Sequence, residues 1–89
     1  MNEKYSYEIK PELNDALKKI AKKNKQLFDA AMKKILQLTE KPELGKSLKY
    51  TLKGVKRVHI GHFVLMYEID YKLHKLSFLK LEHHDKAYK

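Results

Sequence analysis

The feature that most constrains the fold is a change of hydrophobic period near the middle of this 89-residue chain. Between residues 11 and 40, apolar side chains recur every three to four residues, the spacing that places them along one side of an α-helix. After residue 54, the helical spacing ends, and Val58 and Ile60 alternate with Arg57 and His59, as in a strand that buries one face. Neither half can bury its apolar side alone. We therefore expect the two halves to pack on each other as one α+β domain covering residues 1–89.

Two helices are predicted in the first half, joined by a tight turn. Pro11 opens the first helix, because its missing N–H costs little in a first turn. The break near Asn24 leaves room only for a tight turn, and the second helix should end before Pro42. The first helix exposes four lysines (Lys18, Lys19, Lys22 and Lys23), which we interpret as a solvated face, with contact to ribosomal RNA as the alternative. The predicted buried residues are Leu13, Ala16, Leu17, Ile20 and Ala21 in the first helix and Phe28, Ala31, Met32, Ile35 and Leu38 in the second.

The strands complete a β-α-α-β-β-β order. Predicted strands cover residues 5–9, 55–60, 63–70 and 75–82, with turns at residues 61–62 and 70–73 and a loop at residues 43–49. Consecutive strands joined by short turns pair antiparallel. We therefore predict a helical hairpin packed on one face of a small antiparallel sheet, with the other face open.

Alternation along two strands assigns their side chains to faces. Arg57 and His59 point away from Val58 and Ile60, and so lie on the open face. The third strand of the second half is apolar on both sides, and its period assigns no face. In the strand before it, Phe63, Leu65, Tyr67 and Ile69 form one face, and Val64, Met66, Glu68 and Asp70 form the other.

The net charge of +9 at pH 7 is unevenly distributed. Residues 1–45 hold ten lysines against seven acidic residues, whereas residues 46–89 hold ten lysine or arginine residues against four. Such an excess favours an anionic partner: nucleic acid, an acidic protein or a membrane surface. Lysine-rich composition also serves solubility. We interpret the excess as favouring a nucleic acid or ribonucleoprotein.

Several classes of protein are disfavoured by what the chain lacks. It has no cysteine, which excludes disulfides and thiolate zinc sites. Its first eight residues are acidic and polar where a signal peptide needs an apolar run. The longest strongly apolar run, residues 63–67, is far too short to cross a bilayer. We predict a cytoplasmic protein with no membrane partner.

The last third of the chain concentrates the groups that can move protons and hold a phosphate. It contains all five histidines and Arg57, the only arginine. Metal-free RNA cleavage needs a base for the 2′-hydroxyl proton, a cation for the charge on phosphorus and an acid for the leaving oxygen. Imidazole can serve as base and acid near neutral pH, and guanidinium stays charged. The combination indicates ribonuclease chemistry. His59-x-x-His62 with His83-His84 lacks the usual spacing of zinc ligands, so we predict no metal and no cofactor.

The order of these features resembles the RelE/ParE superfamily of bacterial and archaeal toxins, over nearly the whole chain. The matching features are the first strand, the basic helical hairpin, Leu52-Lys53-Gly54, Arg-x-His, Gly-x-aromatic, Tyr67 and a late His-x-x-x-Tyr. The resemblance implies a RelE-like α+β fold of the microbial-RNase type. It also implies a type II toxin held inactive by a RelB-like cognate antitoxin. In the RelE-like branch, such toxins are ribosome-dependent endoribonucleases that cut mRNA, and the pattern here is most similar to the histidine-using YafQ type.

The resemblance assigns family positions to residues of this chain. His59 falls at the histidine or basic position of the first hairpin strand, and His84 at the late histidine. Tyr88 falls at the aromatic position four residues later. Phe63 falls at the aromatic position after the turn, with His62 at the polar position before it.

Two departures from the family pattern favour an imidazole mechanism. Many RelE members have an arginine directly after the hairpin aromatic, where this chain has Val64. Many also have a late arginine, where this chain offers only Asp85 and Lys86. The arginine-dependent version of the reaction therefore fits poorly.

The predicted catalytic residues are His59, His84, Arg57 and Tyr88. The two histidines would serve as base and acid in an undecided order, Arg57 would hold the scissile phosphate, and Tyr88 would stack on a base or bind the phosphate. The alternatives are that His59 is only an exposed strand residue and that His83 works in place of His84. The predicted substrate-binding residues are Lys56, His62, Phe63, His83 and Lys86.

The resemblance implies three partners: the antitoxin, mRNA and the ribosome. The antitoxin segment should be acidic and amphipathic and should cover exposed apolar residues such as Val64 and Met66. A rival interpretation is a non-catalytic toxin of the ParE branch that inhibits DNA gyrase, which would not need His59 and His84. A third is a decayed toxin that only binds its partner.

Overall fold

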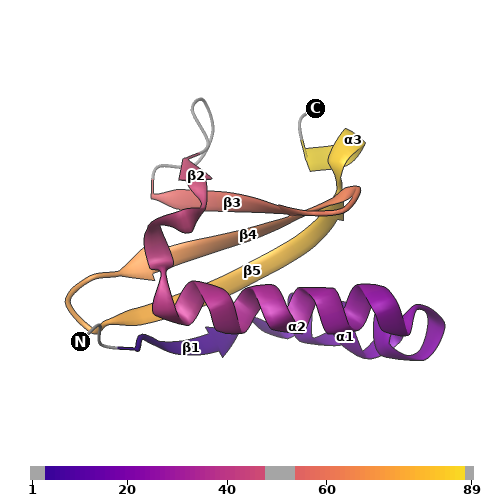
Figure 1. The fold of residues 1–89 in the computed structure, drawn as a ribbon, viewed down its shortest axis with the longest axis horizontal. Helices are drawn as coiled ribbons and strands as arrows, with labels where there is room; N and C mark the ends of the chain where they lie inside the picture. The colour runs from indigo at the N-terminus through magenta and orange to yellow at the C-terminus, as the bar shows by residue number, and fades with distance from the viewer. Residues whose placement is uncertain (1–3, 48–53, 88–89) are drawn as a thin grey trace.

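Two helices lie side by side under one face of a five-stranded sheet (Figure 1). The computed structural model describes residues 4–47 and 54–87, with every side chain in these ranges except those of residues 47, 86 and 87. Within these ranges, no helix is both long enough and apolar enough to cross a membrane. The elements are β1 (Ser6–Ile9), α1 (Pro11–Lys23), α2 (Lys25–Glu40), the 3-10 helix η1 (Pro42–Leu44), β2 (Lys46–Ser47), β3 (Val55–Ile60), β4 (Phe63–Asp70), β5 (Lys75–His83) and α3 (His84–Ala87).

The strand order across the sheet is β1-β5-β4-β3-β2. The last four strands pair antiparallel, whereas β1 pairs parallel with β5. The predicted fold class is confirmed, with the refinement that the sheet is mixed. A parallel pair needs a long connection, and the helices and the intervening strands supply it. β2 lies where a loop was predicted, because two residues are too short to carry a detectable period.

Asn24 both ends α1 and begins α2. Its backbone N–H donates to the carbonyl of Ile20 at 2.7 Å, which closes the last turn of α1. Its side-chain oxygen accepts from the N–H of Leu27 at 3.1 Å, the usual role of asparagine at a helix start. One residue therefore makes the tight turn that the sequence predicts.

The main core lies between the helices and the sheet, and the rings of Tyr67 and Phe78, its two largest fully buried side chains, are in contact. The predicted apolar stripes of the two helices are confirmed except at Ala21, which lies in the last turn of α1 and is exposed. The four lysines of the predicted solvated face of α1 are all exposed. The buried members of the core are Leu13, Leu17, Ala31, Ile35, Leu38, Ile60, Leu65, Tyr67, Leu76 and Phe78.

A second, smaller cluster lies on the opposite face of the sheet. It contains Val55, Val64 and Met66, with Leu79 packed against them. The prediction that Val64 and Met66 are exposed is wrong, since their relative exposures are 0% and 8%. Both sit in the centre of the sheet, between strands whose long side chains can lie over them. The residues directly opposite them are His59 and Glu82 for Val64, and Arg57 and Lys80 for Met66.

A β-bulge explains why the period of β5 assigned no face. The register between β4 and β5 shifts between Met66 and Tyr67, so that Met66 is opposite Lys80 and Tyr67 is opposite Phe78. Leu79 is the extra residue, and it packs on the second cluster. Phe78 and Leu81, on either side of the bulge, both face the helices.

η1 is fixed to the sheet by the hydroxyl of Tyr67. The N–H of Gly45 donates to this oxygen at 2.9 Å, and the hydroxyl donates to the carbonyl of Pro42 at 2.7 Å. Burial raises the pKa of Tyr67, which keeps the hydroxyl protonated as a donor. Glu43 of η1 makes further contacts, with Lys56 at 3.4 Å and with the hydroxyl of Tyr71. The start of β2 is therefore held against β3.

β1 and β5 are linked across the open face by the carboxylate of Glu8, which contacts Lys10 at 2.7 Å and also Lys75. Hydrogen bonds from these two lysines lower the pKa of Glu8 to about 2 from its usual 4.5. Because the folded pKa lies below the unfolded value, this stabilisation is present above about pH 4.5 and is lost as the pH falls toward 2. We expect wild-type Tm to exceed that of Glu8→Gln at pH 6, with the difference shrinking between pH 4.5 and 2.

The measurement is thermal unfolding followed by circular dichroism. Asp15→Asn, which removes an exposed carboxylate from α1, provides the matched charge control. A Tm difference for Glu8→Gln that stays constant over this pH range would contradict the assigned ion pairs.

Candidate active site

His59 and His84 lie together at one end of the open face. Their ring centroids are 5.4 Å apart and the ring planes differ by 30°. His59 is an exposed residue of β3, and His84 is the first residue of α3. Residues 25 positions apart in the sequence are thus neighbours, which is the juxtaposition that the proposed acid–base pair requires.

The fold explains this proximity. His59 is directly opposite Val64, and Val64 is directly opposite Glu82, so all three side chains share the open face. The chain then turns into α3, where the N–H of His84 donates to the carbonyl of His62 at 2.8 Å. The β3–β4 turn therefore anchors the start of α3 next to His59.

His62 and His83 form a second histidine pair beside the first. Their ring centroids are 6.3 Å apart and the planes differ by 14°. The ring of Phe63 meets His83 edge-on at 5.5 Å. Phe63 is directly opposite both Ile60 and His83, which places this group at the strand ends on the helix-facing side of the sheet. Three of the five predicted substrate-binding residues (His62, Phe63 and His83) thus lie together. This group is on the helix-facing side of the sheet, whereas His59 is on the open face.

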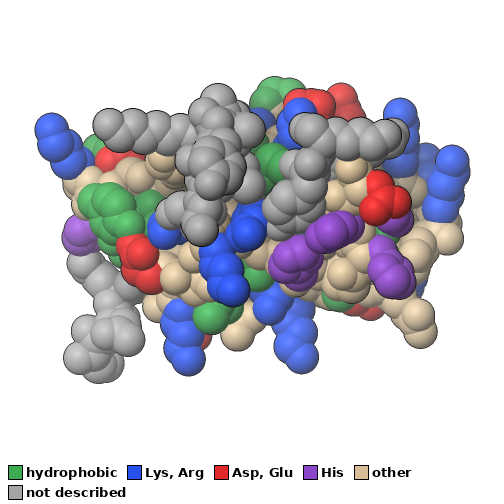
Figure 2. All heavy atoms as spheres, turned by 90° about the horizontal axis from the view of Figure 1, so that it is seen from above, with side chains coloured by type: hydrophobic (Ala, Val, Ile, Leu, Met, Phe, Trp, Pro, Cys, Tyr) green, Lys and Arg blue, Asp and Glu red, His purple; other side chains and the backbone are tan. Residues whose placement is uncertain are grey.

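Arg57 lies on the same face as His59, two residues earlier in β3. Two residues along a strand span about 7 Å, so the guanidinium is within reach of a phosphate that lies against His59. Arg57 is half-buried, whereas His59 is exposed. Figure 2, a view of this face, shows histidine side chains gathered toward one end, with lysine and arginine side chains beside them.

Lys56 does not lie with Arg57 and His59 on the open face. Successive strand residues point to opposite faces, so Lys56 shares the side of Val58, away from Arg57. Its ammonium is 3.4 Å from Glu43, and its side chain is 17% exposed. The structure gives Lys56 a position next to η1.

Two other predicted residues fall outside what can be described. Tyr88 lies beyond the described residues, and the side chain of Lys86 is likewise outside them.

His74 lies in the β4–β5 turn at the other end of the sheet, where its ring stacks on Tyr5 at 5.2 Å. It is remote from the other four histidines.

Two lysines on the open face were not predicted from the sequence. Lys46 of β2 is directly opposite Arg57, and Lys80 of β5 is directly opposite Met66. Strand alternation in β5 would have placed Lys80 on a face, but the bulge adds one residue just before it and hides the period. For Lys46, the segment is too short for any period to reveal its face.

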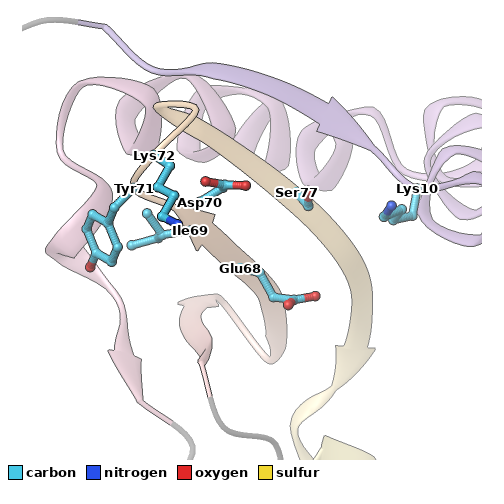
Figure 3. A pocket seen from close by; sticks show the side chains of 7 residues that line it. All are labelled: Lys10, Glu68, Ile69, Asp70, Tyr71, Lys72 and Ser77. Atoms are coloured by element: carbon cyan, nitrogen blue, oxygen red, sulfur yellow. The ribbon is translucent and has the colours of Figure 1, made fainter.

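An open pocket of about 620 Å³ lies at the opposite end of this face. Figure 3 shows Glu68 of β4 and Ser77 of β5 lining it, with Lys10, Asp70 and Lys72 around them. Its two carboxylates offset its two lysines, so the pocket has no net positive charge to attract a phosphate backbone. Within residues 4–47 and 54–87, no three histidine, aspartate or glutamate side chains are grouped as a metal ion would require.

Comparison with known proteins identifies the family. A family model described as the ParE toxin of type II toxin–antitoxin systems matches residues 7–88. This chain belongs to that toxin family. A protein of Methanocaldococcus jannaschii provisionally named toxin RelE4 is 37% identical to this ParE-family toxin over 86 residues, covering 96% of this chain and 92% of the relative.

Solved structures share the fold of this ParE-family toxin. A chain of the RelBE2 toxin–antitoxin complex of Mycobacterium tuberculosis has a TM-score of 0.76 at 23% identity, covering 91% of this chain and 99% of that chain. A chain of the E. coli DinJ–YafQ toxin–antitoxin complex has a TM-score of 0.65 at 18% identity, covering 98% and 100%. The predicted membership of the RelE/ParE superfamily is confirmed. The narrower similarity to the YafQ type is not confirmed by these comparisons and stays a prediction.

Proposed function

We propose that this ParE-family toxin is an endoribonuclease that cuts mRNA on the ribosome, with His59 and His84 as its acid–base pair. The observation that supports the proposal best is the 5.4 Å separation of the two imidazole rings on one exposed face. Two imidazoles this close can flank a single phosphodiester, one on each side of the phosphorus. Arg57 on the same face supplies the cation.

The proposed reaction needs no metal. One imidazole removes the proton of the 2′-hydroxyl, and the 2′-oxygen attacks the adjacent phosphorus. Arg57 stabilises the negative charge that develops on the phosphoryl oxygens. The second imidazole, in its protonated form, gives a proton to the 5′-oxygen as the P–O bond breaks. The products are a 2′,3′-cyclic phosphate and a 5′-hydroxyl.

A cognate antitoxin is the proposed regulatory partner. The net charge of +9 favours an acidic binding segment. The solved RelBE2 and DinJ–YafQ structures are both toxin–antitoxin complexes. Because Val64 and Met66 are buried, the antitoxin would contact the cations of this chain rather than those two residues. We place the pair in the cytoplasm, where ribosomes are found.

Inhibition of DNA gyrase without catalysis is the second candidate function. The matched family model, described as the ParE toxin, favours it. This function would not need the His59–His84 pair, and the two candidates therefore differ in what they require of the open face.

Induction of the toxin in cells, followed by mapping of mRNA 5′ ends, tests the proposal. We expect cuts phased with codons in translated messages, because the ribosome presents mRNA in a fixed frame. Purified toxin should cut mRNA in a translation reaction faster than it cuts the same mRNA without ribosomes. DNA breaks with intact messages would instead support inhibition of gyrase.

A further inference from the structure

We infer that Lys46 is a further substrate-binding residue, contacting an RNA phosphate beside the one that Arg57 holds, and that Tyr67 is the residue that positions it. The inference rests on the proposed ribonuclease function and extends it to β2, where no site residue was expected.

Lys46 and Arg57 are directly opposite each other in the antiparallel β2–β3 pair. Directly opposite residues project to the same face, with Cβ atoms about 5 Å apart. Lys46 is therefore on the open face, beside the guanidinium, and it is exposed. The next strands continue the line with Met66 and then Lys80. Three cations thus lie in one row across the sheet, next to the row that begins with His59.

The outer cation at the other end of this row is partly neutralised. The ammonium of Lys80 lies 3.3 Å from the carboxylate of Glu82. Glu43 precedes Lys46 by three residues, but its carboxylate is paired with Lys56, whose side chain lies on the helix-facing side of the sheet. Lys46 is therefore the more available charge for a strand of RNA that passes over Arg57.

A two-residue strand is too short to hold its own register, so the position of Lys46 depends on the residue before it. Gly45 is buried and packs against the side chain of Tyr67 and the backbone carbonyl of Arg57. The N–H of Gly45 donates to the Tyr67 hydroxyl at 2.9 Å. This bond fixes the backbone one residue before Lys46, which is how Tyr67 acts on the lysine without touching the substrate.

Binding of a labelled single-stranded RNA oligonucleotide to Lys46→Ala tests the first part. The variants are built on His59→Ala/His84→Ala, so that the RNA stays intact. We expect about fivefold weaker binding and a salt dependence whose slope falls by about 0.7, the value for one lost contact with a single strand. Lys46→Arg should restore both. The matched control is Lys72→Ala, which removes an exposed lysine at the other end of the sheet.

Equal affinities and equal salt slopes for Lys46→Ala and Lys72→Ala would overturn the inference. The proposed function is judged separately, by whether the toxin with its histidines intact cuts mRNA in a translation reaction. An active toxin whose Lys46→Ala variant behaves like Lys72→Ala would retain the function and lose the inference.

A double-mutant cycle tests the role of Tyr67. Tyr67→Phe removes the hydroxyl and keeps the ring. If Tyr67 acts through Lys46, this change should weaken RNA binding about fivefold when Lys46 is present and have no effect when it is alanine. An equal loss in both backgrounds would show a general structural role. If Tyr67→Phe does not fold, the comparison of Lys46→Ala with Lys72→Ala still decides whether Lys46 binds RNA.

Discussion

Replacing both His59 and His84 with alanine is expected to slow mRNA cleavage by at least about 10³-fold, because the variant loses both proton-transfer groups. Each single change should cost about 10²-fold or more. The two losses should not add in full, since either one already breaks the coupled proton transfers. The measurement is the initial rate of cleavage in a translation reaction, with the products checked for a 2′,3′-cyclic phosphate.

The chain offers two kinds of control for this prediction. His74→Asn removes a remote histidine, and asparagine tolerates the positive φ of 50° at this position, so the rate should not change. Changing His62 and His83 to alanine tests the neighbouring pair, and should lower the rate much less than changing His59 and His84. A full rate in His59→Ala/His84→Ala, or a larger loss from the neighbouring pair, would reject the assignment.

The layered fold could be predicted from sequence because both helices and β3 have a regular period. The helical stripe around Leu13 and Ile35 and the alternation at Val58 and Ile60 both point to the same core. The orientation of β5 could not be predicted, since the bulge at Leu79 inserts one residue into a period of two. The parallel pairing of β1 was likewise hidden, because its partner lies almost 70 residues away in the sequence.

The candidate site was predictable to the extent that strand alternation governs it. Alternation correctly placed Arg57 and His59 on one face, and the same rule shows that Lys56 belongs on the other. The family resemblance had grouped Lys56 with them, as part of the basic cluster of the same strand. The contribution of Lys46 depends on a register held by Tyr67, a contact between residues 22 positions apart, which no local pattern encodes.

Because Gly45 packs against Tyr67, we expect Gly45→Ala to lower the free energy of unfolding more than alanine at any other described glycine. A Cβ at Gly45 would lie 2.5 Å from the Tyr67 hydroxyl oxygen and 2.8 Å from the carbonyl oxygen of Arg57. Neither neighbour is a flexible chain end, so η1 or β2 must move, and the hydrogen bonds of Tyr67 are strained. Overpacking and weakened buried hydrogen bonds together should cost about 2–4 kcal/mol. Thermal unfolding should show a Tm lowered by about 10–20 °C.

Gly61→Ala separates this clash from ordinary backbone strain. Gly61 has a φ of +60°, and a Cβ there would meet nothing within 4 Å. Its replacement should cost only about 1 kcal/mol, the penalty of alanine in the left-handed region. At Gly45, φ is −76°, which any residue adopts, so the larger loss expected there must come from contact with Tyr67 and Arg57. A Gly45→Ala variant as stable as Gly61→Ala would mean that η1 moves aside freely, and the fixed position of Lys46 would then have no physical basis.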